Sequence, residues 1–327
     1  MANEHDESAD RTTPPQAPIR VAYTLEQCWH PAPGGTAVAA LRIARELATM
    51  SAEVELLQVA GRHPQPPRPE FRPSGSVAML PLGRPLLYDA WTRLNWPKVE
   101  SVTGPIELAH ATGLVPCATA APMVVTVHDL AFRRDPDKFT RRGVRIMNRS
   151  LEVIGSRAAR VICSSRATFD DCVEAGLDPD RLRVVPLGVD IEAVAPADVR
   201  RVRRRYELPD DFVLFVGTVE PRKNLDRLAA AVDTSGQLLV VAGADGWGDQ
   251  SAVERDHVRF LGFVPAEDLA ALYAAASVFA YASETEGFGL PVAEAMAQGT
   301  PVVTSASTST AEVAGGAAVL VDPFDVG

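Results

Sequence analysis

The sequence predicts an α/β protein built from two doubly wound domains, each with a parallel β-sheet covered by helices. Short apolar segments with strand patterning alternate with helical segments along almost the whole chain, which is typical of parallel sheets. The 327 residues are enough for two such domains. We expect a disordered tail at residues 1–17, a first Rossmann-like domain at 18–190 and a second at 191–327.

The predicted elements alternate in the same way in both halves of the chain. The strand candidates of the first half are IRVAYT (19–24), EVELLQVA (53–60), SVAML (76–80), IELAHAT (106–112), MVVTVHD (123–129), ARVICSS (159–165) and RLRVVPLG (181–188). Those of the second half are FVLFVGT (212–218), QLLVVAG (237–243), HVRFLGF (257–263), SVFAYAS (277–283), TPVVTS (300–305) and AAVLVD (317–322). Helical segments such as TAVAALRIARELATM (36–50) and KNLDRLAAAV (223–232) separate the strands, and the boundary is expected within residues 187–199.

Composition and charge narrow the function. The formal net charge of −10 argues against nucleic acid as a partner. The longest apolar candidate, LAALYAAASVFAYA (269–282), is too short to span a membrane, and the N-terminal segment lacks the apolar core of a secretory signal. The cysteines lack metal-site spacing and are expected to be free thiols in a reducing cytosol; they are Cys28, Cys117, Cys163 and Cys172. These features predict a cytoplasmic location.

Two glutamates flank a glycine-rich turn in ETEGFGLPVAEAMAQGTPVV (284–303). Pro291 suits the first turn of a helix and Gly299 suits its end, so Glu286 would precede the helix and Glu294 would lie about one turn inside it. Free N–H groups at a helix start favour a phosphate, and carboxylates accept hydrogen bonds from hydroxyls. The arrangement suits a ligand with a phosphate and a sugar. Alternatively, Glu286 favours the helix dipole and Glu294 is a solvated helix residue.

Two further segments place polar side chains where a predicted strand ends. FVGTVEPRKNLDRL (215–228) puts Arg222 and Lys223 in a turn, where two cations can hold a diphosphate leaving group or form a solvated basic turn. VTVHDL (125–130) puts His128 at a strand end, where it can bind a sugar hydroxyl, act as a general base or belong to a structural network. In open α/β sheets, ligands bind beyond these strand ends.

Two glycine-rich turns also follow predicted strands. PAPGGTAVAALRIARELA (31–48) places Gly34 and Gly35 just before a helix, but loops use glycine freely, so this turn is weak evidence alone. VAGADGWG (241–248) either flanks a nucleotide or is a plain turn.

EGFGLPVAEAMAQGTPVV (286–303) closely resembles the glutamate–seven residues–glutamate signature of family 4 glycosyltransferases, which have the GT-B fold. The resemblance extends over nearly all of the chain from about residue 18. It implies that two Rossmann-like domains face a cleft, with the acceptor side on the first domain and the nucleotide-sugar donor mostly on the second. It also implies transfer with retention of anomeric configuration, on the face from which the leaving group departs, without a cofactor or a metal.

The resemblance assigns donor contacts residue by residue. Glu294 would accept hydrogen bonds from ribose hydroxyls and Glu286 from hydroxyls of the donor sugar. Arg222 and Lys223 match the diphosphate-binding turn, and His128 matches a histidine that faces the transferred sugar. Together these make His128, Glu286, Arg222 and Lys223 the catalytic candidates.

The remaining donor-binding candidates are mainly backbone groups. N–H groups around Phe288 and Gly289 would assist at the diphosphate, and Gly287 and Leu290 belong to the same loop. Gly34 and Gly35 match a glycine loop near the donor phosphates and the acceptor, and Phe263 and Val264 lie in LGFVPAEDL (261–269), which matches the segment beside the nucleobase. Many relatives have an arginine where this chain has Thr218, so Arg222 is expected to supply that charge.

The resemblance also narrows the substrates. The HDL and EPRKN segments look most like mannosyl- and rhamnosyltransferases, which favours GDP-mannose over a UDP- or dTDP-sugar. The acceptor would be a saccharide or a lipid-linked molecule. Basic runs at residues 133–149 and 200–205 are solvated helix faces or contact an anionic membrane at the inner membrane face.

A metal site of the Asp-x-Asp type is not expected. Asp135–Pro136–Asp137 and Asp178–Pro179–Asp180 read as proline turns in loops, and no Walker loop, nucleophile elbow or zinc motif occurs.

Relatives continue beyond VDPFDVG (321–327) with further helices, so the resemblance implies that C-terminal helices are missing from the second domain. For residues 1–327 we expect weak or absent transfer with nucleotide binding partly preserved, exposed apolar surface, and self-association or poor solubility. Two alternatives to a glycosyltransferase stay open: a non-catalytic sugar-nucleotide-binding or partner protein, and a GT-B sugar-nucleotide epimerase.

Overall fold

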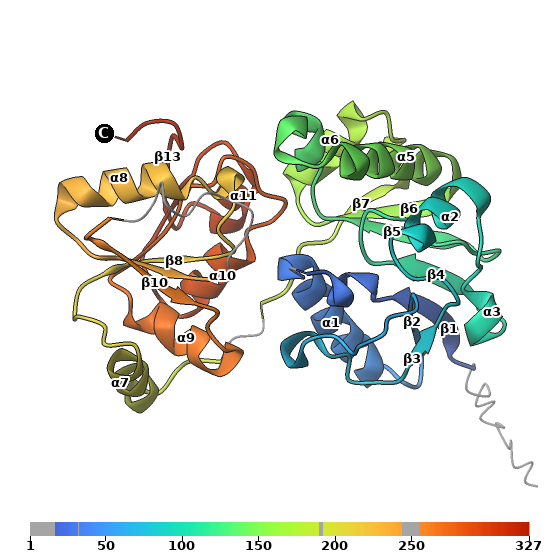
Figure 1. Cartoon of the computed structure of the whole chain (residues 1–327), viewed down its shortest axis with the longest axis horizontal. Coiled ribbons are helices and arrows are strands. Elements are labelled where there is room, and N and C mark those ends of the chain that lie inside the picture. Colours follow the sequence, from blue (N-terminus) through green and yellow to red (C-terminus); the bar gives the residue numbers. More distant parts are fainter. Residues whose placement is uncertain (1–16, 32, 190–191, 244–254, 327) are drawn as a thin grey trace, which may run out of the picture.

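The computed structural model describes residues 17–31, 33–189, 192–243 and 255–326, which form two parallel β-sheets side by side (Figure 1). The predicted tail therefore lies almost wholly outside the described residues, as does most of the VAGADGWG turn. Every described strand lies inside a predicted segment, except that β6 begins one residue before its segment, and all the described strand pairs are parallel. The predicted α/β class with two doubly wound sheets is confirmed.

The first sheet has the order β3-β2-β1-β4-β5-β6-β7, so the chain winds outward from β1 in both directions. Its strands are β1 (Ile19–Thr24), β2 (Val54–Ala60), β3 (Val77–Met79), β4 (Leu108–Ala111), β5 (Met123–Val127), β6 (Ala158–Cys163) and β7 (Leu182–Val184).

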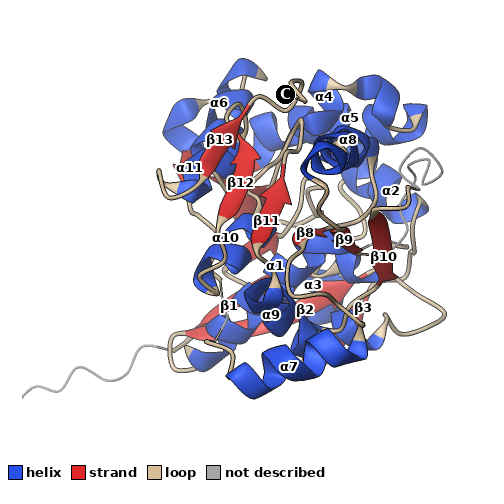
Figure 2. Ribbon diagram, turned by 90° about the vertical axis from the view of Figure 1, so that its left-hand side faces the viewer, coloured by secondary structure: helices blue, strands red, loops and turns tan. Residues whose placement is uncertain are grey.

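The second sheet has the order β10-β9-β8-β11-β12-β13 and winds outward from β8 in the same way. Its strands are β8 (Val213–Val216), β9 (Leu239–Ala242), β10 (Val258–Gly262), β11 (Val278–Tyr281), β12 (Val302–Ser305) and β13 (Val319–Val321). Figure 2 shows β11, β12 and β13 of this sheet lying in order beside one another.

Helices and short 3₁₀ turns connect the strands. The helices of the first half are α1 (Gly34–Thr49), α2 (Leu86–Leu94), α3 (Glu100–Thr103), α4 (Ala131–Arg134), α5 (Arg141–Arg157) and α6 (Arg166–Glu174). They are followed by α7 (Pro196–Arg205), α8 (Leu225–Ser235), α9 (Ala266–Ala275), α10 (Leu290–Ala297) and α11 (Ser309–Ala314). The 3₁₀ turns are η1 (Glu26–Trp29), η2 (Pro69–Phe71), η3 (Pro136–Lys138), η4 (Pro179–Arg181) and η5 (Pro221–Lys223).

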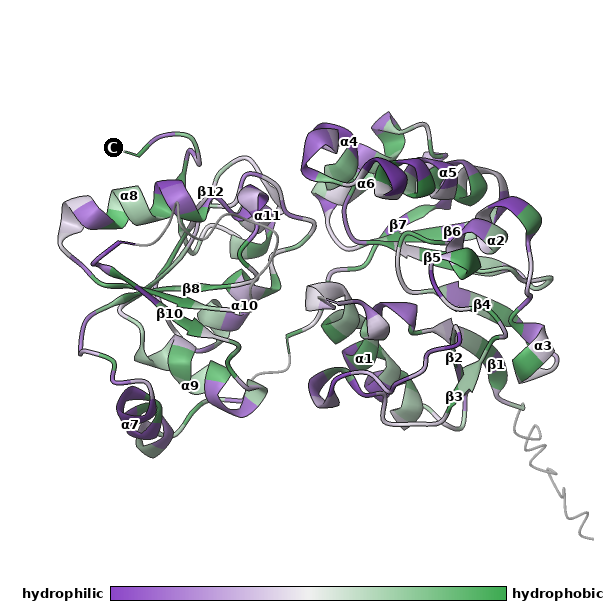
Figure 3. Cartoon of the chain, viewed as in Figure 1, coloured by the Kyte–Doolittle hydropathy of each residue, from purple (hydrophilic) through white to green (hydrophobic). Residues whose placement is uncertain are grey.

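Hydrophobic residues gather in the strands of both sheets, and α7 is largely hydrophilic (Figure 3). The β9 strand is buried along its whole length, because helices cover both faces of a doubly wound sheet. The four cysteines are buried and free, as predicted. Within the described part of the chain, no helix is long and apolar enough to cross a membrane.

The two sheets meet through helices and loops that follow their strands. α1 of the first half lies against α10 of the second through an ion pair between Arg42 and Glu294. α6 packs against α11, where Glu312 accepts hydrogen bonds from the backbone N–H groups of Arg166 and Ala167. These contacts hold the loops at the carboxyl ends of both sheets next to one another.

Candidate active site

A cleft of about 180 Å³ lies between the two halves of the molecule. It gathers most of the site residues expected from the sequence, namely Gly34, Gly35, His128, Arg222, Lys223, Glu286, Gly287, Phe288, Gly289 and Leu290. A second pocket shares Gly34, Gly217 and Thr218 with the cleft and extends to Phe263 and Val264. Glu294 belongs to neither lining and is buried nearby.

The loop before α10 packs directly on the backbone of the first domain. A Cβ atom on Gly287 would lie 2.0 Å from the carbonyl oxygen of His128, so only glycine fits at this position. The carbonyl oxygen of Gly287 accepts a hydrogen bond of 2.7 Å from the hydroxyl of Ser165. The hydroxyls of Thr168 (3.1 Å) and Ser164 (3.2 Å) also lie within hydrogen-bonding distance, and each shares its single proton between this oxygen and the carbonyl oxygen of His128. The loop is therefore tied to the start of α6.

These hydroxyl groups were not among the site residues predicted from the sequence. Ser164 and Ser165 follow β6 directly, at a carboxyl strand end like the other candidates. That position was the available signal, but short hydroxyl side chains are common in loops and do not identify a partner 122 or 123 residues away.

The start of α10 has the form that its sequence predicts. Gly289 precedes the helix with a φ of 97°, and its Cβ atom would lie 2.6 Å from Cγ2 of Thr310. Pro291 occupies the first turn, and Gly299 follows the helix with a φ of 74°. The N-terminus of α10 thus lies at the cleft wall, where its N–H groups and partial positive charge favour an anion.

Glu286 is bound to two cations and a tyrosine at the cleft. Its Oε1 atom lies 2.5 Å from Nζ of Lys223 and 3.3 Å from Nη1 of Arg222, and it accepts a hydrogen bond of 3.1 Å from Tyr281. Lys223 also donates a hydrogen bond to Tyr281. Oε2 takes part in none of these contacts, so the second oxygen of Glu286 is left to accept a hydroxyl.

This cluster keeps Glu286 ionised. Burial alone would raise the pKa of Glu286, but the charges of Lys223 and Arg222 lower it to about 2. Burial lowers the pKa of Lys223, an effect that Glu286 opposes. The pKa of Arg222 is raised because the attraction of Glu286 and Glu220 outweighs its burial. The alternative of a solvated basic turn is wrong, because Lys223 is buried and both cations face carboxylates.

Arg222 and Thr218 both line the cleft. The Nε atom of Arg222 donates to Glu220 at 2.8 Å, and its Nη1 atom donates to the carbonyl oxygen of Thr285 at 3.2 Å. These contacts fix the guanidinium group against the loop that carries Glu286. They identify Glu220 as a site residue that the sequence did not single out.

Glu294 is held across the domain interface. Nη2 of Arg42 lies 3.3 Å from Oε1 of Glu294, and Tyr273 donates a hydrogen bond of 3.0 Å to Oε2. Burial raises the pKa of Glu294, an effect that Arg42 and Tyr273 oppose. The alternative that Glu294 is a solvated helix residue is therefore wrong.

His128 faces the cleft with one ring nitrogen already bound. Nε2 lies 3.2 Å from the carbonyl oxygen of Thr112, and because a carbonyl can only accept, Nε2 carries the proton. Burial lowers the pKa of His128, which favours the neutral ring. With the proton on Nε2, Nδ1 can accept a hydrogen bond. Its backbone carbonyl accepts hydrogen bonds from Ser164 and Thr168.

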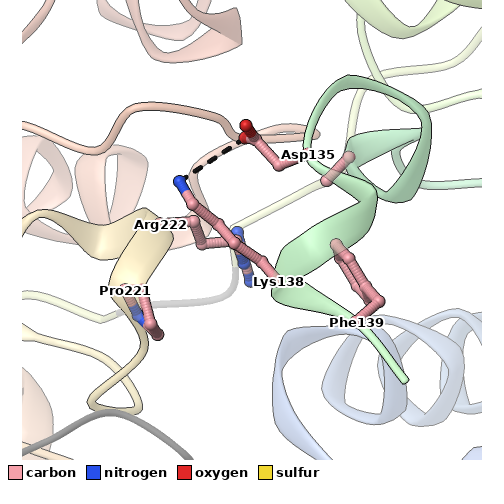
Figure 4. A pocket seen from close by; sticks show the side chains of 6 residues that line it. Asp135, Lys138, Phe139, Pro221 and Arg222 are labelled. Carbon is pink, nitrogen blue, oxygen red and sulfur yellow. Dashed lines mark ion pairs between the residues drawn. The ribbon is translucent and has the colours of Figure 1, made fainter. Parts of the chain in front are cut away.

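A small pocket lies at the rim of the cleft, between η3 and η5 (Figure 4). Asp135, Lys138, Phe139, Pro221 and Arg222 line it, and Lys138 forms an ion pair of 3.5 Å with Asp135. Lys138 also reaches Glu284 of the second domain at 2.7 Å. These contacts form a charged link between the two halves, and the pocket itself, at about 10 Å³, is too small for a sugar.

Both Asp-Pro-Asp segments lie in 3₁₀ turns with proline at the start, η3 and η4. Asp178 caps η4 by accepting a hydrogen bond from the N–H of Asp180, which is turn chemistry. Within the described ranges, no group of three or more His, Cys, Asp or Glu side chains is arranged to hold a metal ion.

Many cations of the two basic runs are paired within the protein. Arg142 and Arg149 both bind Asp89, Arg134 binds Asp171, and Arg201 and Arg205 both bind Asp268. These pairs fix α5 and α7 against neighbouring elements.

Known proteins resemble this chain in sequence and in fold. Residues 33–193 match the model of "Glycosyltransferase Family 4", and residues 199–326 match that of "Glycosyl transferases group 1". The O-antigen chain mannosyltransferase B of Escherichia coli is 36% identical over 220 residues, which cover 62% of this chain and 58% of that protein. The chain thus spans less than two thirds of that relative's length.

A second relative is matched over more of its length. The D-inositol 3-phosphate glycosyltransferase of Acidothermus cellulolyticus is 30% identical over 341 residues, covering 89% of this chain and 75% of that protein. The crystal structure of Anabaena HepE in complex with UDP and glucose superposes with a TM-score of 0.70 at 20% identity, covering 94% of this chain and 87% of HepE. The chain therefore belongs to the family 4 (group 1) glycosyltransferases and has their GT-B fold.

Proposed function

We propose that this chain transfers a hexose from a nucleotide sugar to a saccharide or lipid-linked acceptor, with retention of anomeric configuration and without a metal ion. The observation that carries the proposal is the cluster of Glu286, Lys223 and Arg222 at the cleft, beside the N-terminus of α10. Two cations and a helix N-terminus favour a diphosphate, and an ionised carboxylate next to them favours sugar hydroxyls.

Each group then has a role in the reaction. Arg222 and Lys223 bind the diphosphate and offset the charge that develops as the bond to the sugar breaks, with help from N–H groups around Phe288 and Gly289. Oε2 of Glu286 accepts a hydrogen bond from a donor-sugar hydroxyl. The nucleobase lies in the second pocket beside Phe263 and Val264.

His128 binds the transferred sugar from the first domain in this proposal. Its Nδ1 atom accepts a hydrogen bond from a hydroxyl, because Nε2 is already committed to Thr112. The acceptor hydroxyl approaches past Gly34 and Gly35, and attacks on the face from which the diphosphate departs. The acceptor oxygen bonds to the anomeric carbon as the bond from that carbon to the diphosphate breaks, and the departing diphosphate takes up the proton of the acceptor hydroxyl, so no separate protein base is needed.

We propose mannose as the transferred sugar and GDP-mannose as the donor. A relative at 36% identity is named a mannosyltransferase, which supports this choice. HepE has been crystallised with UDP-glucose, so a UDP-sugar is the second donor to test.

The test is a binding and turnover assay with GDP-mannose, UDP-glucose and a dTDP-sugar. The true donor at a hundredfold its dissociation constant should raise the free energy of unfolding by about 2.7 kcal/mol. It should also release its nucleoside diphosphate in the presence of a mannose-terminated oligosaccharide, and the product should keep the donor's anomeric configuration. Binding without turnover would support a non-catalytic binding protein instead, and epimerised nucleotide sugar would support an epimerase.

An anionic membrane surface is a further proposed partner. Arg133, Arg141 and Arg145 are exposed, and no carboxylate in the described part of the chain pairs with them. Co-sedimentation with phosphatidylglycerol vesicles should be lost when all three are changed to glutamine, and an unchanged bound fraction would contradict the proposal.

A further inference from the structure

Arg42 reaches from the first domain to a carboxylate of the second. Its Nη2 atom donates to Oε1 of Glu294 at 3.3 Å, which is long for a bond between a guanidinium and a carboxylate. Tyr273 holds the other oxygen of Glu294 at 3.0 Å. The three side chains come from α1, α9 and α10, so the cluster lies where these helices meet.

This cluster lies one helical turn beyond the wall of the second pocket. Val38 of α1 and Leu269 of α9 line that pocket. Arg42 and Tyr273 follow them by four residues on the same two helices, so each lies on the same helix face as the pocket residue before it. The pocket wall and the cluster are therefore continuous along both helices.

The guanidinium group of Arg42 is only partly satisfied. Nη1 is buried, and none of the described residues accepts a hydrogen bond from it. A guanidinium group is always charged and offers five N–H donors, so a buried nitrogen without an acceptor is costly. The carboxylate of Glu294 has spare capacity too, since its two oxygens together can accept about four hydrogen bonds.

A hydroxyl group satisfies both side chains at once, because it donates one hydrogen bond and accepts others. It can accept from Nη1 of Arg42 and donate to Glu294. A carbonyl or phosphate oxygen can only accept, and would repel the carboxylate. The chemistry of this pair thus selects a ligand with a hydroxyl next to the base pocket, which in a nucleotide sugar is the ribose.

We propose that Arg42 binds a ribose hydroxyl of the donor nucleotide together with Glu294, and so makes the site specific for ribonucleotides. This inference rests on the proposed function, because it needs a nucleotide in the cleft. Arg42 belongs to the first domain and Glu294 to the second. The ribose consequently joins the two domains through a contact that neither domain can make alone.

The experiment is calorimetry with nucleoside diphosphates on three proteins: the wild type, Arg42→Ala and Arg45→Ala. Arg45 is exposed on the same helix and is the matched control. The probes are UDP and GDP, each with its 2′-deoxy and 3′-deoxy forms. Wild type should bind the ribonucleotide about 10- to 100-fold more tightly than at least one deoxy form.

We expect Arg42→Ala to weaken binding of the ribonucleotide by a similar factor and to abolish the preference for it over that deoxy form. Arg45→Ala should behave as wild type. If Arg42→Ala weakened binding of the ribonucleotide and of the deoxy forms equally, Arg42 would have a structural role. If it tightened binding of the ribonucleotide, Arg42 would compete with the ribose. Either result overturns the proposal.

A wild-type protein that binds none of these nucleotides would instead overturn the proposed function, and this inference with it. Melting temperatures of the three proteins identify loss of folding. If Arg42→Ala is unfolded, Arg42→Lys keeps a charge without the second nitrogen, and it must then show the same loss of preference for the ribonucleotide for the proposal to stand.

Discussion

Lys223 and Glu286 form an ion pair of 2.5 Å between side chains that are both almost fully buried. The pair joins the turn after β8 to the loop before α10, and Arg222 and Tyr281 share the same carboxylate oxygen. Removing one partner of such a pair leaves a buried charge without compensation, which typically costs about 3–5 kcal/mol. The site and the fold of the second domain therefore depend on the same contact.

Glu286 and Glu294 should have separable effects on binding and turnover. We expect Glu286→Gln to change nucleoside diphosphate affinity by less than about threefold while lowering turnover of the nucleotide sugar, because its free oxygen faces the sugar. Glu294→Gln should weaken binding of the nucleoside diphosphate itself by about 10- to 100-fold. Calorimetry and steady-state kinetics measure the two quantities. Equal losses of nucleotide affinity in both variants would show that these roles are wrongly assigned.

Stability should fall with acid in a way that Glu286 controls. The folded-state pKa of about 2 lies below the ordinary value of 4.5, so the ionised carboxylate stabilises the fold above pH 4.5. This stabilisation is lost as the pH falls from about 4.5 to 2, and the pKa difference corresponds to about 3 kcal/mol. Denaturant titrations across this range should show a smaller acid-dependent loss for Glu286→Gln than for wild type. An identical pH dependence would contradict the folded-state pKa.

Glu294 should act in the opposite direction. Its pKa is raised by burial, so the folded state binds the proton more tightly than the unfolded chain and gains relative stability as the pH falls. Glu294→Gln should remove that gain, measured in the same titrations. A variant whose stability relative to wild type does not change between pH 7 and 4 would contradict this sign.

Gly287→Ala should disrupt the site by shape alone. The new Cβ atom would lie 2.0 Å from the carbonyl oxygen of His128, so the loop before α10 must move. We expect a loss of about 1–3 kcal/mol in stability and a strong loss of turnover. Gly113→Ala is the matched control, since nothing lies within 4 Å of its Cβ position. Equal stability and turnover of both variants would show that the loop adapts freely.

Turnover should survive an excess of chelator, because Arg222 and Lys223 supply the positive charge that a metal would bring to the diphosphate. Arg222→Gln should then lower turnover with chelator present, and Arg204→Gln, at an exposed position of α7, serves as its control. Complete loss of activity in chelator, restored by magnesium or manganese, would contradict the role of the two cations.

The strands and much of the site could be predicted from the sequence, because both follow from local patterns. Apolar runs mark β1 to β13, and polar residues after β5, β8 and β11 lie at the cleft since parallel strands end at one edge. Pro291 and Gly299 bound α10 for purely local steric reasons. In contrast, the start of α1 was predicted two residues late, because the helix begins at Gly34 and glycine has a low helix propensity.

The contacts between domains could not be predicted in this way. Arg42 and Glu294 are 252 residues apart, and nothing local in either helix indicates the other. The contacts between these hydroxyls and Gly287 could not be predicted for the same reason, because the residues are far apart in the sequence. The local sequence pattern therefore allowed Glu294 to be predicted only as solvated or as ligand-bound, whereas the fold buries its side chain against Arg42 and Tyr273.

The cross-domain contacts are unevenly distributed, and this sets the direction in which the cleft can open. Near α6, three hydroxyls contact the carbonyl oxygen of Gly287 and Glu312 caps the helix, whereas near α1 the described residues form one ion pair between the halves, at 3.3 Å. We expect the α6–α11 edge to act as a pivot, with α1 swinging away from α9 to admit the nucleotide (Figure 1). Spin labels on α1 and α9 should show a broad distance distribution that narrows with nucleotide, while labels on α6 and α11 stay fixed. Equal broadening at both edges would mean that the halves separate without a hinge.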